Sequence, residues 1–437
     1  MQQRCLTRRL PRQERGVATL LVVMALFFLV SMVAAYTSRS LIFEQRTSAN
    51  QYRATQAFEA AEGGVEWALA HLNGSRVDDA CQDTADPAAG SFRSRYLVFD
   101  PERGTMSPLR WISATLGPQS LSPGCTRSAA GWQCNCPVNS ATVLPQGDGT
   151  TVQPAFRMVF EGTSTPGLMR IVSTGCTAAN DDCLRLGQGD ATVAAARINV
   201  TVAMAPALAA LPAAALTARG QVSVASTAIA INEDANTQGL AVHAGGAVSG
   251  VDSVSLAGSP TVSASGSPSG SPSSNTVVSG DAALSGLSAD RFFASFFGVS
   301  RAAYTRQPAV ATFSCAGGCG DRLRAFIQAN PGRPVYISDA LVIDSAGDIG
   351  SAAAPVLLVV NGAAQWASGG AQLYGVLYAQ GASAASASAS WLQGALISEA
   401  DISAPALPNL RYDAAILQRI RSQQGSFVRL PGGWKDF

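Results

Sequence analysis

The sequence predicts an α+β protein that begins with one long helix, continues into a β-rich head and ends in a second β-rich region built as a β-solenoid. Three observations predict this order: an uncharged apolar run near the N-terminus, strand patterns in the middle of the chain, and a short repeat late in the sequence. At 437 residues, of which 47% are hydrophobic and 14% charged, the chain is long and apolar enough to bury more than one core.

The N-terminal helix is predicted from charge and periodicity. Residues 17–35, VATLLVVMALFFLVSMVAA, carry no ionisable side chain and approach the ~20 residues that cross a bilayer as a helix. Five arginines precede this run, which places the N-terminus in the cytoplasm. Apolar residues then recur every three or four positions to Leu72, and Asn73 with Gly74 supplies a stop. We therefore predict a transmembrane and rod helix over residues 17–74.

Strand patterns follow the helix. RMVF at 157–160, LMRIVST at 168–174 and ARINVTVAM at 196–204 predict a β-rich head domain over residues 75–205. Residues 206–220 are low in charge and contain two prolines, so they are predicted as a linker. Alternation resumes at Gln221, and residues 221–437 are predicted as a β-rich tip domain.

A repeat predicts the architecture of this tip domain. LLVVNG, VLYAQG and ALISEA begin at Leu357, Val376 and Ala395, at intervals of 19 residues. A period of this length, with one short buried strand and one turn in each repeat, is typical of a β-solenoid. A small β-sandwich with chance spacing is the alternative. Residues 288–298 and 321–332 predict short helices beside the coils.

Few residues are suited to catalysis or metal binding. Histidine occurs twice, at His71 and His243, which argues against Ser-His or Cys-His nucleophiles and against a His-rich zinc site. The acids Asp344 and Asp348 are interpreted as turn residues, and the loop NEDANTQG at 232–239 as a turn, with a calcium site as its alternative. With 30 basic and 29 acidic residues, no overall charge favours nucleic acid. We predict no catalytic residue, metal or cofactor.

The cysteines indicate an oxidising compartment. Nine are present, and Cys5 lies before the apolar run. Cys315 and Cys319 are close enough in sequence to pair, as are Cys176 and Cys183, while the remaining four allow three connectivities. The candidate disulfide residues are Cys81, Cys125, Cys134, Cys136, Cys176, Cys183, Cys315 and Cys319.

Two segments carry a family resemblance. Arg15, Gly16 and Val17 open the apolar helix, and QAFEAAEGGVEWAL at 56–69 closes it. Together they resemble the type IV pilins and, among these, the PilX-like minor pilins. The resemblance implies that residues 1–16 are a prepilin leader, that prepilin peptidase cuts between Gly16 and Val17, and that the new amine of Val17 is N-methylated.

One position departs from the family. Most pilins have Glu as the fifth mature residue, where it is thought to meet the amine of the subunit ahead, whereas counting from Val17 places Leu21 there. A subunit without that carboxylate is expected to have no neighbour ahead of it.

The resemblance implies a function without catalysis. We expect a minor pilin that primes or caps type IV pilus assembly and displays its tip domain, in an adhesive role. The expected partners are other minor and major pilins, prepilin peptidase, and a pilus-tip adhesin or host surface. The protein is expected in the inner membrane with its C-terminal domain in the periplasm, and then at the pilus tip on the cell surface. The alternatives are a tip pseudopilin of type II secretion, and a signal-anchored envelope carbohydrate-binding protein or enzyme.

Overall fold

The computed structural model describes residues 16–115, 117–145, 153–179, 194–225, 229–249, 255–257, 276–385 and 390–436. The predicted leader before Gly16, with Cys5, and the predicted disulfide residue Cys183 lie outside these ranges. The chain divides into two compact units, residues 1–56 and residues 57–437. Helix α1 (Gly16–Leu72) runs unbroken through the first unit into the second. The predicted long helix and the α+β class are confirmed.

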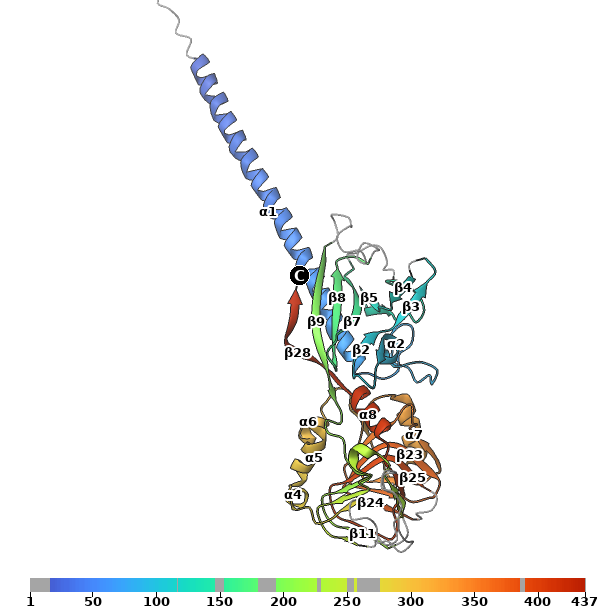
Figure 1. The fold of residues 1–437 in the computed structure, drawn as a ribbon. Helices are drawn as coiled ribbons and strands as arrows, with labels where there is room; N and C mark the ends of the chain where they lie inside the picture. Colours follow the sequence, from blue (N-terminus) through green and yellow to red (C-terminus); the bar gives the residue numbers. More distant parts are fainter. Residues whose placement is uncertain are drawn as a thin grey trace, which may run out of the picture. The chain divides into compact units, whose positions relative to one another are not determined.

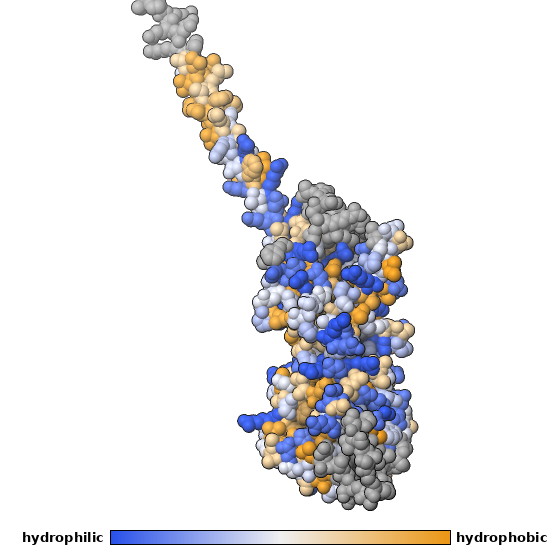
Figure 2. All heavy atoms as spheres, in the orientation of Figure 1, coloured by the Kyte–Doolittle hydropathy of each residue, from blue (hydrophilic) through white to orange (hydrophobic). Residues whose placement is uncertain are grey.

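In the first unit, α1 is a bare apolar helix. Residues 18–52 are all exposed, and the helix contains the one segment of the described chain that is long and apolar enough to cross a membrane, with a mean hydropathy of 2.6. Figure 2 shows its N-terminal part in the orange of hydrophobic residues, with hydrophilic blue appearing further along. The helix has no core of its own to bury this surface, which fits a lipid or protein environment.

The head domain is an antiparallel sheet packed on the last part of α1. The strand order is β28-β9-β8-β7-β5-β6. The bounds are β5 (Gly124–Ser128), β6 (Gly131–Asn135), β7 (Ala155–Gly162), β8 (Leu168–Cys176), β9 (Ala195–Pro206) and β28 (Gly425–Asp436). Alternate residues of β7 and β9 are buried, as the sequence pattern predicts for a sheet with one covered face. A short helix, α2 (Phe92–Tyr96), and two hairpins complete the head: β1 (Leu97–Phe99) with β2 (Met106–Pro108), and β3 (Arg110–Ser113) with β4 (Gly117–Ser120).

The tip domain is a β-solenoid. Its strands pair only in parallel within the described residues, in coils of up to three short strands. One series contains β10 (Leu216–Ala218), β11 (Val222–Val224), β12 (Ile229–Ile231), β13 (Val242–Ala244), β14 (Val248–Ser249), β15 (Ser255–Ala257) and β16 (Val277–Val278). The other contains β17 (Ala311–Phe313), β18 (Val335–Ile337), β19 (Leu341–Ile343), β20 (Gly347–Ile349), β21 (Val356–Val360), β22 (Ala363–Trp366), β23 (Ala371–Ala379), β24 (Gly381–Ala384), β25 (Trp391–Ser398), β26 (Ile402–Ala404) and β27 (Asn409–Arg411).

The register agrees with the sequence repeat. Leu357 pairs with Val376, and Val376 pairs with Ala395, so the interval of 19 residues is one coil. The sandwich alternative is wrong for this region because sandwich sheets are antiparallel, whereas these ladders are parallel. Strands β23 and β25 each turn a corner, ending one coil and beginning the next. Gly375 and Gly394 occupy these corners and pair with each other across adjacent coils.

The coils do not stack in chain order. Strand β10, where the chain enters the solenoid, lies between β25 and β13 in the ladder. From there the chain winds outward to β16. It then passes through α4 (Ala282–Ser285), α5 (Ala289–Phe297) and α6 (Arg301–Tyr304) to β17 at the other end of the ladder. It winds back along the ladder until β25 pairs with β10. The first coil in the chain therefore stacks on a late one, an order that we call a circular permutation.

Helices cover one ladder of the solenoid. Phenylalanines of α5 and the apolar face of α8 (Ala414–Gln423) pack on outward side chains of β21, β23 and β25, which are therefore buried on both faces. The predicted helix at 288–298 is confirmed, with Ser288 as N-cap and Gly298 ending it in the left-handed region. The second predicted helix is α7 (Gly320–Ala329). A 3₁₀ turn, η1 (Ala235–Thr237), lies between β12 and β13.

Two domain boundaries differ from the prediction. The predicted linker at 206–220 contains strand β10 and the buried residues Ala207 and Leu208, so its low charge reflects burial rather than flexibility. The predicted tip domain at 221–437 loses its last segment, because β28 returns to the head and pairs with β9. Figure 1 shows β28, in red, beside the green β9. The solenoid is thus an insertion between two neighbouring strands of the head sheet.

Candidate functional site

The residues predicted for processing lie at the first described turn of the chain. Helix α1 begins at Gly16, and Val17 follows it within the helix. Leu21 lies one turn further on and is 63% exposed. The first acidic side chain after Val17 is that of Glu44, beyond the apolar run. The exposed helix surface around Leu21 therefore offers a partner apolar contact and no carboxylate.

The other end of α1 is seated on the head sheet through small residues. A Cβ added at Gly175 of β8 would lie 2.2 Å from both Ala57 O and Ala61 N, so the helix backbone touches this strand directly. The helix residues that face the sheet, Ala57, Ala61, Val65 and Ala68, are fully buried. The AFEAAEGG stretch is therefore explained by close packing of the helix on the sheet.

The two adjacent glycines of this stretch are expected to respond oppositely to alanine. A Cβ at Gly64 would meet Ser173 Oγ at 2.4 Å and the Phe156 ring at 3.0 Å, whereas a Cβ at Gly63 meets nothing nearer than 3.7 Å. Gly64→Ala should lower the unfolding free energy by about 1–3 kcal/mol through overpacking. Gly63→Ala should raise it by about 0.5–1 kcal/mol through helix propensity. Denaturant titration of the two variants measures both, and equal effects would contradict the packing argument.

Disulfides fasten the loops of the head and one turn of the solenoid. Cys125 and Cys134 join β5 to β6, and Cys81 and Cys136 join the loop after α1 to the end of that hairpin. Cys315 and Cys319 are bonded just before α7. Cys176, at the end of β8, is also disulfide-bonded. Of the three connectivities that the sequence left open for four of the cysteines, the structure thus has the one that pairs Cys81 with Cys136 and Cys125 with Cys134.

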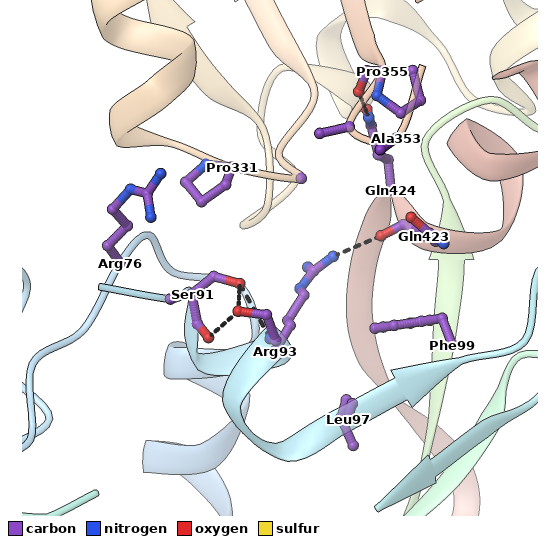
Figure 3. Close-up of a pocket in the computed structure, with 14 residues that line it drawn as sticks. Arg76, Ser91, Arg93, Leu97, Phe99, Pro331, Ala353, Pro355, Gln423 and Gln424 are labelled. Atoms are coloured by element: carbon purple, nitrogen blue, oxygen red, sulfur yellow. Dashed lines mark hydrogen bonds between the residues drawn. The ribbon is translucent and has the colours of Figure 1, made fainter. Parts of the chain in front are cut away.

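Arg93 ties the head to the solenoid. Its side chain is buried and donates to Leu72 O, the last residue of α1, and to Gln423 O at 3.4 Å, the last residue of α8. It also donates to Gly425 O at 2.6 Å, where β28 begins. Figure 3 shows the bond to Gln423. Leu72 O and Gln423 O carry the partial negative charge of two helix C-termini, so the buried cation is held without a carboxylate.

Burial makes this charge costly. Desolvation, followed by repulsion from Arg333, lowers the pKa of the Arg93 guanidinium to about 9. The group therefore remains charged at neutral pH, and the carbonyl contacts offset the cost of burying it. The aromatic ring of Phe427 lies 4.9 Å below the guanidinium carbon and adds a cation–π contact.

The residues considered for chemistry have structural contacts. His71 stacks on Trp67, and His243 Nε2 lies 2.8 Å from Asp281 Oδ2. Asp344 accepts a bond from Gly320 N at the start of α7. Asn232, the first residue of the loop considered for calcium, is fully buried and donates to Leu240 O at 2.7 Å.

Asp234, an acid of the same loop, caps η1 by accepting from Asn236 N. Both side chains therefore build a turn. Across the described ranges, no three His, Cys, Asp or Glu residues are grouped so as to hold a metal ion.

Sequence reasoning missed Arg93 and the return of β28. In the sequence Arg93 lies between Phe92 and Ser94, with Arg95 two positions on, which resembles a solvated surface segment. Nothing in its neighbourhood signals the distant carbonyls that it contacts. Strand β28 contains Pro431, Gly432 and Gly433, which interrupt its alternation. These three residues lie where the register with β9 shifts, between Arg429 and Trp434.

Comparisons with known proteins place the N-terminal segment. Residues 15–66 match the family model described as PilX N-terminal. Among solved structures, the competence-associated pilin ComZ from Thermus thermophilus is 11% identical, with 88% of this chain and 98% of that chain covered and a TM-score of 0.21. A search of curated proteins finds no match.

Proposed function

We propose that this chain, a type IV pilin-like protein, is a minor pilin that primes or caps a filament and displays its solenoid at the filament end. The match of residues 15–66 to the PilX N-terminal model supports the pilin role. The observation that carries the end position is Leu21, because it leaves the exposed N-terminal helix without a carboxylate.

The physical argument concerns a buried amine. The resemblance implies that, in a pilin filament, the carboxylate of the fifth mature residue contacts the N-terminal amine of the subunit ahead. A leucine cannot neutralise that amine, and an unpaired charge in low dielectric costs several kcal/mol even after relaxation. A subunit that enters first avoids this cost because no amine lies ahead of it.

The size of the displayed domain supports the same position. The solenoid occupies residues 207–424, inserted into one small head. Many copies of such an insertion would crowd the sides of a closely packed filament, whereas an end leaves room. We propose adhesion as the role of the displayed surface, with other pilins and prepilin peptidase as assembly partners.

Processing is the first test. We expect the mature protein to begin at Val17 with a methylated amine. Intact mass of the membrane-extracted protein measures this directly, because removal of residues 1–16 and addition of one methyl group give one defined mass. A mature protein that retains Cys5, or one cut near Ala35, would contradict the pilin role and favour a plain signal anchor.

Position is the second test. Epitope labelling of sheared filaments should place the solenoid at one end of each filament. Leu21→Glu should then permit some incorporation along the shaft, limited by the size of the solenoid. Leu20→Glu, at the adjacent exposed position, is the matched control and should not. Regular labelling along the shaft in the wild type would refute the end position.

A further inference from the structure

Two neighbouring segments of the chain connect the solenoid to the head. The chain leaves the head at Pro206, the last residue of β9, and returns at Gly425, the first residue of β28. These two residues are partners in the ladder, and just beyond them Ala207 N donates to Gln424 O at 2.9 Å. A pull on the solenoid therefore reaches the head through the ends of two adjacent strands.

Such a pull acts along the strands. Figure 1 shows β9 and β28 lengthwise in the head, with both connections to the solenoid at the same end. The hydrogen bonds of an antiparallel ladder lie perpendicular to its strands. A lengthwise pull therefore loads the whole ladder of β9 with β8, from Leu168 to Cys176, at once instead of one bond at a time. The sheet is thus arranged to resist tension between the solenoid and α1, the helix packed on it.

Three helices end near these connections. Helix α1 ends in the head, and helices α7 and α8 end in the solenoid. Arg93 donates to Leu72 O of α1 and, at 3.4 Å, to Gln423 O of α8 (Figure 3). Arg76, in the loop after α1, donates to Gln328 O in the last turn of α7 at 2.7 Å. Helix C-termini carry partial negative charge, so both arginines bind ends that attract a cation.

The end of α1 is also bonded directly to the returning strand. Asn73 Oδ1 accepts from Phe427 N at 2.8 Å, and Asn73 Nδ2 donates to Phe427 O at 3.0 Å. Arg93 bridges the same two segments, because it donates both to Leu72 O and to Gly425 O. Asn73 is 5% and Arg93 6% exposed, so water competes little with these bonds.

We propose that Asn73, Arg76 and Arg93 form a clamp that carries tension from the solenoid to α1. Without the clamp, tension that enters at Gly425 would reach the helix only through the sheet, whereas the clamp passes it directly to the last residues of α1. The proposal rests on the displayed, adhesive role only for the source of the tension. Its test uses isolated protein and no filament, so the clamp and the filament-end position can fail independently.

Magnetic tweezers on the full-length protein in detergent test the clamp. DNA handles on azidophenylalanine at the exposed positions Glu59 of α1 and Ala415 of α8 load the connection to the solenoid. Handles at Glu59 and Ala130, the exposed tip of the β5–β6 hairpin, load the head sheet but not that connection. At one constant force, Arg93→Gln should shorten the folded lifetime of the head at least about tenfold more in the first direction, because only that direction loads its bonds to the returning chain. Equal shortening in both directions, or none in the first, would overturn the proposal.

Control variants separate force bearing from general stability. Gly64→Ala overpacks the helix against the sheet without touching the clamp, so it should shorten the lifetime by the same factor in both directions. Arg103→Gln, at a side chain that is 81% exposed, should change neither. Arg93→Lys keeps the charge but replaces the fork of donors with one ammonium, so it should show the directional effect by a smaller factor. If thermal melting shows that Arg93→Gln does not fold, Arg93→Lys decides the test by the same criterion.

Discussion

Removing residues 425–437 is expected to unfold the head domain while the coils of the solenoid persist. The deletion removes β28, which pairs with β9 along the edge of the head sheet. It also removes the backbone of Phe427, which exchanges hydrogen bonds with the buried side chain of Asn73 at 2.8 and 3.0 Å. Asn73 would lose both bonds to Phe427, and Arg93 would lose its bond to Gly425 O, so two buried polar groups would be left with fewer partners at a further cost in stability.

Hydrogen exchange with mass spectrometry measures this by region. Peptides from β7 and β8 should lose protection, whereas peptides from β21 to β25 should keep it. A point pair provides the control on the same strand: Phe427→Ala, at a 2% exposed position, should cost about 3–5 kcal/mol, and Val428→Ala, at a 40% exposed position, should cost less than about 1 kcal/mol. Full protection of the head after the deletion would show that β28 is dispensable.

Replacing one corner glycine of the solenoid is expected to have a comparably large effect. Gly394 has φ of 135°, and a Cβ added there would lie 1.9 Å from Gly375 O in the adjacent coil. Gly394→Ala therefore combines a disfavoured backbone conformation with a backbone clash that no rotamer change relieves. The expected loss is at least about 3 kcal/mol, localised to the coils on either side.

Gly381 supplies the matched control. It lies in the same region of the solenoid, and a Cβ there would meet nothing nearer than 3.6 Å. Gly381→Ala should change stability by less than about 1 kcal/mol. Denaturant unfolding of the two variants, with hydrogen exchange of peptides from β23 and β25 to locate the change, distinguishes the corner from glycines in general. Similar losses in both variants would mean that the corner geometry is not what requires glycine.

The parts predicted well from the sequence are those whose signal is local and repeated. The equal spacing of Leu357, Val376 and Ala395 predicted the length of one coil because each coil packs on its neighbours in the same way. The long helix was predictable because an uncharged apolar run that continues into a helical period, with no helix breaker between them, folds as one helix. Helix α5 was predictable because the residues that cap its two ends, Ser288 and Gly298, can be recognised in the sequence.

The parts that were not predicted depend on distant contacts. Nothing near β28 indicates that its partner is β9, because the pairing joins segments separated by the whole solenoid. The circular permutation has the same origin, since the pairing of β10 with β25 is invisible to any local pattern. The prediction of a linker at residues 206–220 was wrong because a buried segment, like a flexible one, can be low in charge and contain proline.

The insertion also sets the order in which this protein can be finished. A chain synthesised from its N-terminus contains β9 early, and the outer edge of that strand stays open until β28 has been made. Open strand edges recruit other chains, so an incomplete copy is prone to aggregation. Closure of the head by β28 therefore requires that the whole solenoid is already in place, and a truncated or stalled copy lacks the finished head sheet.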